Sequence, residues 1–209
     1  MNEIIQGTDA WFAQRLGKVT SSKLADVIAK TKSGPSTSRA NYMAQLICER
    51  LTGRREESYT NAAMEWGTAT EPAARMAYEA TTGNMVQEVG FVLHPVIGGF
   101  GGSPDGLIDD NGMVEIKCPN TATHIEWLRG KKVPTKHKAQ IQGLMECCKR
   151  DWCDFISYDP RLPEHLQLFV VREKYDAEYC AMLTEEVRAF LSELDKMEIE
   201  LAAPLKIAA

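Results

Sequence analysis

The sequence predicts an α/β fold in which one mixed β-sheet is flanked by helices. Helical apolar spacing dominates residues 8–82, and from about residue 85 the spacing changes to the alternation of strands. Two helical segments then separate the third and fourth strands, which places helices on the faces of a sheet. The 209 residues suffice for one core, and no long linker divides them, so we expect a single domain over 1–209.

Four helical segments are expected in the first part of the chain. They are a helix capped by Thr8 that runs through Arg15, one capped by Thr20 or Ser21, one over 38–51, and one over 61–82. The third stops at Gly53, a residue suited to a helix C-terminus. We expect the fourth to be interrupted near Gly67, with Pro72 in the first turn of its second half.

Five strands follow the helical part. They are predicted at 85–93, 98–108, 113–118, 152–158 and 166–171. Helices at about 122–129 and 135–149 lie between the third and fourth strands, and a last helix spans about 176–201.

The composition is that of an ordinary globular protein, with 44% hydrophobic and 25% charged residues. There is no apolar run of membrane-spanning length and no export signal, which argues against a membrane span and against secretion. The six cysteines form no CxxC pair, so we expect reduced thiols in a cytoplasmic protein.

The net charge of −5 conceals a segregation of charge along the chain. Residues 1–55 carry +5, 56–116 carry −9, 117–150 carry +6 and 151–209 carry −7. An acidic middle between basic flanks suits a cation site beside a polyanion. The alternative is a set of solvated faces that happen to cluster.

The strand at 113–118 carries the chemistry. Side chains alternate along a strand, so Glu115 and Lys117 share one face, while Val114, Ile116 and Cys118 share the other. We expect the apolar face to be core and the polar face to be the site.

The hairpin before this strand decides whether Asp105 joins the site. If residues 110–112 form a three-residue loop, with Gly112 left-handed and a bulge there, Asp105 pairs with Lys117 and faces the same side as Glu115. A two-residue Asn-Gly turn would turn Asp105 to the other face. We predict the longer loop.

Two carboxylates and an ammonium group on one sheet face suggest a divalent metal. Mg²⁺ prefers oxygen ligands and commonly takes one or two carboxylates together with a substrate phosphate. Such a site can hydrolyse a phosphodiester, with Lys117 orienting or helping to deprotonate the water, or acting as a point charge. The alternative is a surface salt bridge on an edge strand.

Two motifs resemble a known family. The first motif is Gly102-Ser103-Pro104-Asp105-Gly106-Leu107, and the second is Val114-Glu115-Ile116-Lys117-Cys118-Pro119. They resemble the signature of the phage lambda exonuclease family, also called the YqaJ-type viral recombinases, which belong to the PD-(D/E)xK nucleases. Further segments fall in the same order: Trp11 with Arg15-Leu16-Gly17 and Thr20-Ser21-Ser22, Trp66-Gly67 with Glu71, Ala139-Gln140-Ile141-Gln142, and Tyr158-Asp159-Pro160-Arg161. The resemblance implies a restriction-endonuclease-like core.

The resemblance also implies an activity. It points to a Mg²⁺-dependent 5′→3′ exonuclease, with Mn²⁺ able to substitute, that degrades one strand from double-stranded DNA ends and leaves 3′ single-stranded tails. It further implies a homotrimeric ring, a single-strand annealing protein as partner, no membrane, and a phage or prophage origin in a bacterial host. The alternatives are a PD-(D/E)xK endonuclease or structure-specific nuclease, and a DNA-end-binding module without catalysis.

The resemblance assigns roles to the residues that match the motifs. Asp105, Glu115, the main-chain oxygen of Ile116 and Glu71 would be metal ligands, and Lys117 the catalytic lysine. Gln140 would lie near the attacking water or the cleaved strand. Leu144 departs from the second half of the glutamine motif. An alternative for Glu71 is a first-turn glutamate favoured by the helix dipole.

The remaining implied residues would contact DNA. Arg15, Ser22 and Lys32 match a 5′-phosphate pocket, in which Lys32 stands where an arginine is expected, and Met64 matches an apolar wedge. A basic cluster would track phosphates and consists of Arg129, Lys131, Lys132, Lys136 and Lys138, with His137 among them. The alternative for Lys32 is a flexible loop lysine, and the alternative for Met64 is an ordinary core methionine. The alternative for the basic cluster is a solvated helix face.

Overall fold

The computed structural model describes residues 4–32, 34–55 and 61–202. Its first half is mostly helical. It contains α1 (Asp9–Arg15), β1 (Val19–Thr20), the 3₁₀ helix η1 (Ser21–Lys23), α2 (Leu24–Val27), β2 (Lys30–Thr31), β3 (Gly34–Pro35), α3 (Thr37–Thr52) and α4 (Ala62–Thr82). The expected cap of the first helix is confirmed, because the Thr8 hydroxyl accepts a hydrogen bond from the Trp11 amide.

The second half supplies the main sheet. It contains β4 (Val92–Leu93), β5 (Phe100–Gly102), β6 (Gly106–Ile108), β7 (Gly112–Lys117), α5 (Thr121–Gly130), α6 (Thr135–Cys148), β8 (Trp152–Tyr158), α7 (Glu164–Gln167), β9 (Leu168–Lys174) and α8 (Ala177–Ala202). Both helices between β7 and β8 and the long last helix lie where the sequence predicts them.

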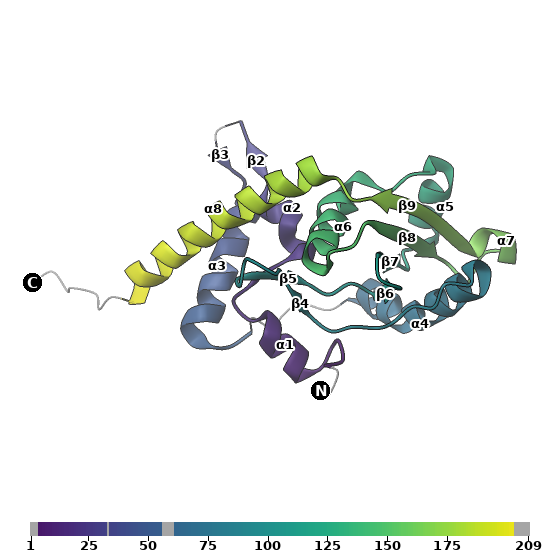
Figure 1. Cartoon of the computed structure of the whole chain (residues 1–209), viewed down its shortest axis with the longest axis horizontal. Coiled ribbons are helices and arrows are strands. Elements are labelled where there is room, and N and C mark those ends of the chain that lie inside the picture. The colour runs from purple at the N-terminus through teal and green to yellow at the C-terminus, as the bar shows by residue number, and fades with distance from the viewer. Residues whose placement is uncertain (1–3, 33, 56–60, 203–209) are drawn as a thin grey trace, which may run out of the picture.

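A four-stranded mixed sheet of order β6-β7-β8-β9 lies at the centre of this half. β7 and β8 are parallel, and the two outer pairs are antiparallel. α4 lies along one face of the sheet, and α5 and α6 lie along the other (Figure 1). β7 is therefore an interior strand, which contradicts the alternative of a salt bridge on an edge strand.

Both faces of the sheet are packed. Val114 and Ile116 pack with Ala74 and Tyr78 of α4, whereas Met113 packs toward α5 and α6 with Trp127, Ile141 and Leu144. The expected core face of Val114 and Ile116 is confirmed, but the polar face is not reserved for chemistry, because Met113 shares it and is fully buried.

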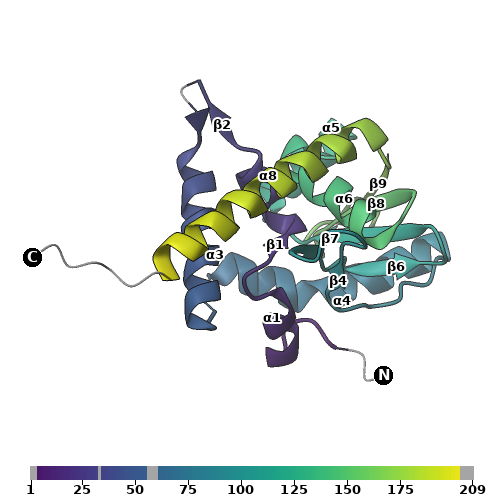
Figure 2. The same cartoon turned by 60° about the vertical axis from the view of Figure 1, so that its left-hand side comes forward.

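A third apolar cluster joins α2, α3 and α8 to the small sheet β1-β5-β4. α8 crosses α3, and the β2–β3 hairpin projects from the start of α3 (Figures 1 and 2). α1 lies near the other end of α3, where the Gly17 amide donates to Glu49 at 2.9 Å. The sequence analysis missed β1, the β2–β3 hairpin and α7, all of which have four residues or fewer.

The expected break in the fourth helix is wrong. α4 runs without interruption for 21 residues, with Pro72 inside it. One glycine costs a helix only about 1 kcal/mol, and α4 buries Ala74 and Tyr78 completely against the sheet. Packing therefore outweighs the local preference.

Two strand predictions are corrected. The segment 85–93 forms only β4 and an isolated bridge between Gln87 and Leu107. The segment 98–108 is two strands in different sheets, β5 and β6, because the residues between them include Pro104, which has no amide hydrogen to donate.

The hairpin has the predicted three-residue loop at shifted positions. Ile108 pairs with Gly112, so the loop is 109–111, and the left-handed residue is Asp109 rather than Gly112. The predicted register is wrong, but the sum of paired residue numbers changes by two. Because a shift by two residues leaves each side chain on the same face of the sheet, Asp105 still faces the side of Glu115 and Lys117. In this register Asp105, which directly precedes β6, lies opposite Glu115 instead of Lys117.

All six cysteines are free thiols. Among the described residues, no helix combines the length and apolarity required to cross a bilayer.

Candidate active site

Glu115 and Lys117 of β7 form the centre of the site. The Lys117 Nζ lies 2.5 Å from Glu115 Oε1, and Gln140 of α6 donates to the same oxygen at 2.6 Å. Glu115 is 0% exposed. The structure thus brings three of the predicted residues together, with Gln140 on the glutamate itself.

Asp105 joins the site through the backbone of the same strand. Its Oδ2 accepts a hydrogen bond of 2.6 Å from the Ile116 amide. Burial raises the pKa of Asp105, against the opposing effects of Lys117 and that hydrogen bond. The carboxylate therefore lies within the electrostatic reach of Lys117, as the parity of the hairpin predicts.

Glu71 reaches the site from α4, on the other side of the sheet. Burial, together with the charge of Asp105, raises the pKa of Glu71 to about 7, although Arg75 and Lys117 oppose the rise. Arg75 Nη2 lies 3.2 Å from Glu71 Oε1, and Arg75 Nη1 binds Glu88. Glu71 is thus part of the acidic cluster, and the alternative of a first-turn glutamate is wrong because Glu71 lies in the middle of the uninterrupted α4.

The electrostatics of the cluster favour an added positive charge. Burial raises the pKa of Glu115 to about 7, and Asp105 contributes to the rise while Lys117 opposes it. Burial alone would lower the pKa of Lys117, but Glu115 and Asp105 raise it above its ordinary value. Lys117 is therefore protonated at neutral pH, and the raised pKa values of the carboxylates reflect burial and mutual repulsion that a bound cation would relieve.

One oxygen in the cluster fits a metal ligand. Glu115 Oε2 is buried and has no hydrogen-bond partner among the described residues, because Lys117 and Gln140 both use Oε1. A buried, unpaired carboxylate oxygen is costly unless something binds it. The described residues contain no group of three His, Cys, Asp or Glu side chains set to hold a metal. A cation here would therefore also use main-chain and water oxygens, as Mg²⁺ commonly does.

A cavity of about 310 Å³ lies between α1, α3 and α4. Arg15, Ser22 and Met64 all line it, and Met64 is 52% exposed, so it is not a core methionine. The guanidinium of Arg15 lies 4.1 Å from the Trp11 ring centroid. Burial lowers the pKa of Arg15, the expected effect of partial enclosure on a cation.

Ser103 and Arg55 belong to the same region, and the sequence analysis gave neither a role. Arg15 Nη1 and Trp11 Nε1 both bind the Ser103 hydroxyl, at 3.3 and 2.9 Å. Arg55 lines the cavity and lies 3.7 Å from the Phe12 ring centroid. Ser103 directly precedes Pro104 and Asp105 of the motif, and this position in the sequence could have marked it as a residue of the site.

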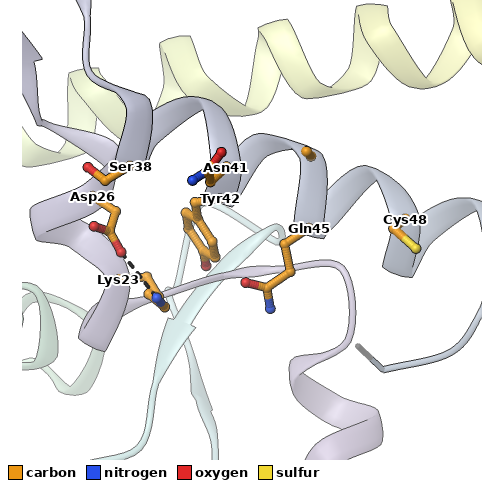
Figure 3. A pocket seen from close by; sticks show the side chains of 8 residues that line it. Lys23, Asp26, Ser38, Asn41, Tyr42, Gln45 and Cys48 are labelled. Carbon is orange, nitrogen blue, oxygen red and sulfur yellow. Dashed lines mark hydrogen bonds and ion pairs between the residues drawn. The ribbon is translucent and has the colours of Figure 1, made fainter. Parts of the chain in front are cut away.

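A second cavity of about 580 Å³ adjoins the first, because Lys23, Tyr42 and Gln45 line both. Figure 3 shows its polar lining along α3, with Lys23 paired to Asp26 at 3.2 Å. Lys32 lines neither cavity. It lies in the connection of the β2–β3 hairpin and is exposed.

Some residues of the basic cluster are exposed to solvent, and others contact neighbouring side chains. Lys131 and Lys132 are exposed between α5 and α6, and Lys136 lies 5.2 Å from the Trp127 ring centroid. His137 stacks on Phe155. Its burial, together with the charges of Lys117 and Lys136, lowers its pKa to about 4. Two further members differ: Arg129 is exposed, whereas Lys138 pairs with Asp176.

The match to a family model decides the classification. The model of the YqaJ-like viral recombinase domain matches residues 10–151. The chain belongs to this family. The recognition made from the two motifs is thus confirmed, and the matched range contains all the predicted site residues.

Solved structures agree with the assignment to the YqaJ-like family. An alkaline exonuclease from Laribacter hongkongensis is 51% identical, with 93% of this chain and 96% of that chain covered and a TM-score of 0.87. The same exonuclease in complex with dAMP is 52% identical over the same shares, with a TM-score of 0.88. The restriction-endonuclease-like fold expected from the sequence is confirmed by this likeness.

A phage-related exonuclease from Haemophilus somnus 129PT shares the fold at 16% identity, with 88% of this chain and 96% of that chain covered and a TM-score of 0.72. No match is found among curated proteins.

Proposed function

We propose that this YqaJ-like chain is a metal-dependent exonuclease that degrades one strand of double-stranded DNA from its 5′ end. The observation that carries the proposal is the cluster of Asp105 with Glu115 and Lys117 of β7, in which one oxygen of the buried Glu115 has no partner among the described residues. The 51% identity to an alkaline exonuclease over 93% of this chain supports the same reaction.

Mg²⁺, or Mn²⁺ in its place, would be held by Asp105, Glu115, the main-chain oxygen of Ile116 and Glu71. The three carboxylates are not grouped for a metal in this structure, so their side chains would move toward the ion when it binds. A bound divalent metal makes a water more acidic and offsets the charge that develops on the phosphate. Lys117 contributes a fixed positive charge next to the reacting phosphate, since its raised pKa makes it a poor base. Gln140 holds Glu115 Oε1 and so fixes the direction of Oε2.

The strand polarity would come from the cavity that contains Arg15 and Ser22. Arg15 offers a guanidinium fork to a terminal 5′-phosphate, and Ser22 and Ser103 offer hydroxyls. Met64, exposed at the same cavity, would separate the terminal base pairs. Lys32 stays a predicted phosphate contact on the hairpin, separate from this cavity.

Sequence-independent contacts would come from the basic cluster. Lys131, Lys132 and Lys136 would follow the DNA backbone, with His137 beside them. The product would be a 3′ single-stranded tail and mononucleotides, and the dAMP complex of the related exonuclease is consistent with such a product. We also propose a homotrimeric ring and a single-strand annealing protein as its partner in recombination.

The test is nucleotide release from linear 5′-phosphorylated duplex and from closed circular duplex, each with Mg²⁺ and with EDTA. We expect release from the linear DNA alone, and its loss in EDTA. Cutting of the circle would instead identify an endonuclease or structure-specific nuclease. Binding of ends without release would identify an end-binding module.

A further inference from the structure

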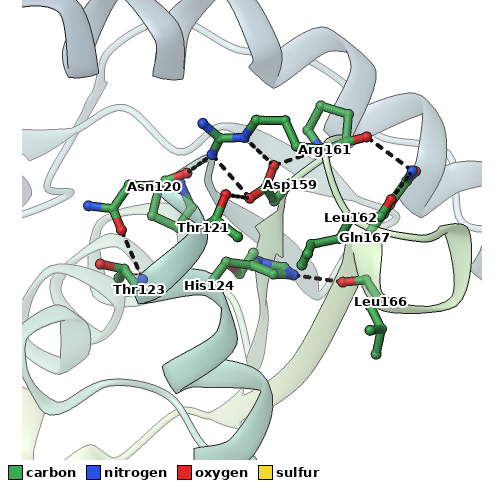
Figure 4. Close-up of polar contacts among 12 residues, drawn as sticks. Asn120, Thr121, Thr123, His124, Asp159, Arg161, Leu162, Leu166 and Gln167 are labelled. Carbon is green, nitrogen blue, oxygen red and sulfur yellow. Dashed lines mark hydrogen bonds and ion pairs between the residues drawn. The ribbon is translucent and has the colours of Figure 1, made fainter.

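The turn that follows β8 contains a buried carboxylate that the proposed chemistry does not use. Asp159 is fully buried and accepts from the Arg161 amide at 3.0 Å, Nε at 2.7 Å and Nη2 at 3.0 Å. The Thr121 hydroxyl donates to it at 2.6 Å (Figure 4). These bonds outweigh burial and lower the pKa of Asp159 to about 2, so the pair stays charged.

Arg161 also holds the segment that leaves the catalytic strand. Its Nη2 donates to the Pro119 carbonyl at 3.1 Å, and Pro119 is two residues beyond Lys117. Thr121, bound to Asp159, is the first residue of α5. The chain just after Lys117 is therefore fixed at two points to the turn after β8.

The same guanidinium contacts α4. It lies 4.6 Å from the ring centroid of Trp66, and Trp66 precedes Glu71 by five residues on that helix. One side chain thus joins the turn after β8, the end of β7 and the helix that carries Glu71. Glu71 and Lys117 come from opposite sides of the sheet, and this connection adds a polar contact near the site to the apolar packing of α4 on β7.

We propose that Arg161 is a positioning residue of the nuclease site that sets α4 and Glu71 relative to the end of the strand carrying Glu115 and Lys117. The inference rests on the proposed function. It gives a role to the Tyr158–Arg161 segment and to Trp66, which the motif comparison singled out without one.

Arg172 provides a matched control in the same sheet. Its guanidinium binds Asp154 at 2.8 Å through two nitrogens and lies 3.5 Å from the Trp152 ring centroid. The side chains of Arg161 and Arg172 are 45% and 47% exposed. Among the described residues, the guanidinium of Arg172 contacts Asp154 and Trp152 of β8 and makes no direct bond to α4, and Asp154 keeps the Tyr78 hydroxyl when Arg172 is removed.

The experiment compares R161A, R161K and R172A in the full chain. Initial rates over a range of linear duplex concentrations with Mg²⁺ separate kcat from KM, and amide hydrogen exchange without metal or DNA reports on residues 118–124. For R161A we expect kcat to fall about tenfold to a hundredfold, because misplacement by 1 Å can cost a factor of about 100. KM stays unchanged, exchange at 118–124 accelerates, and R161K gives an intermediate result.

For R172A we expect neither effect. Equal losses of kcat in R161A and R172A would overturn the proposal, since both would then act through general stability. A rise in KM at constant kcat would make Arg161 a DNA contact and would also overturn it. If the wild type releases no nucleotide, the proposed function fails, while the exchange comparison still decides whether Arg161 orders the segment. Should R161A fail to fold, R161K carries the same test.

Discussion

At the residue scale, the two oxygens of Glu115 have different roles. Oε1 takes both donors, Lys117 and Gln140, and Oε2 is buried with no partner in the part of the chain that the structure describes. Fully paired, the carboxylate would be a structural ion pair. Half paired, it fits the metal ligand we propose, because a bound cation would remove the cost of the unpaired oxygen.

The Glu115→Ala variant should therefore bind duplex ends and fail to cut them. It removes a ligand and leaves Arg15, Ser22 and the basic cluster intact. We expect a loss of activity of about a hundredfold or more, the size typical for one preorganised electrostatic group. Binding is measured by fluorescence anisotropy in EDTA, and cutting by nucleotide release. Activity within about tenfold of the wild type, less than that group is worth, would remove Glu115 from the mechanism.

The raised pKa of Glu71 predicts a pH dependence of stability in the absence of metal. A carboxyl with a folded-state pKa of about 7 and an ordinary value of 4.5 stabilises the fold below pH 4.5. That contribution is lost as the pH rises through 7. The Tm of the metal-free protein should fall between pH 5 and 8, and Glu71→Gln should reduce the fall because it removes one repelling charge. Parallel Tm curves for the two proteins, recorded in EDTA, would contradict this account.

Arg15 and Lys32 should differ in how they respond to the chemistry of the DNA end. Arg15 lines the cavity with Ser22 and Met64, and Lys32 does not. We expect R15A to lose the preference for 5′-phosphorylated over 5′-hydroxyl duplex, and K32A to lose activity equally on both, as a backbone contact would. A selective loss in K32A on 5′-phosphorylated ends would place Lys32 at the terminal phosphate.

At the element scale, local patterns predicted the position of β7 and β8 and the three-residue length of the hairpin loop. They could not predict which loop residue is left-handed, since Asp109 adopts that conformation while Gly112 was free to do so. The prediction of a break near Gly67 was wrong because α4 is stabilised by packing against the sheet, which the sequence of the helix alone does not indicate. The prediction that Asp105 joins Glu115 and Lys117 required only that the pairing be shifted by an even number of residues, so the error in register did not affect it.

Two glycines in helices test how closely the elements approach. A Cβ on Gly143 of α6 would lie 2.1 Å from Leu24 Cδ1 of α2, whereas one on Gly67 of α4 meets nothing within 4 Å. Gly143→Ala should destabilise the fold by about 1–3 kcal/mol through overpacking. Gly67→Ala should stabilise it by about 0.5–1 kcal/mol, the usual gain in a helix. Both are measured by urea unfolding, and a stabilised G143A would show that α2 and α6 pack less tightly.

At the scale of the whole molecule, the site is assembled from segments that are distant in sequence. Glu71 comes from the helix on one face of the sheet and Gln140 from a helix on the other, and only Asp105, Glu115 and Lys117 are close along the chain. Asp105, Glu115 and Lys117 could therefore be predicted from their spacing and their chemistry. Glu71 and Gln140 were reached only through the family resemblance, because no local pattern links two helices across a sheet.

The predicted ring is the property of the whole molecule that a measurement of mass decides. A single chain of 23.3 kDa presents exposed apolar side chains on α4 and α8 and on the segments around β4, including Met76, Met85, Val96 and Ile199. Such side chains are typical of protein interfaces when they gather into a patch. We expect a sedimentation mass about three times that of one chain, independent of concentration over the assay range, as closed cyclic symmetry gives. A mass near 23.3 kDa for a chain that still releases nucleotides would refute the ring and leave the nuclease site, since every side chain proposed to act there comes from one chain.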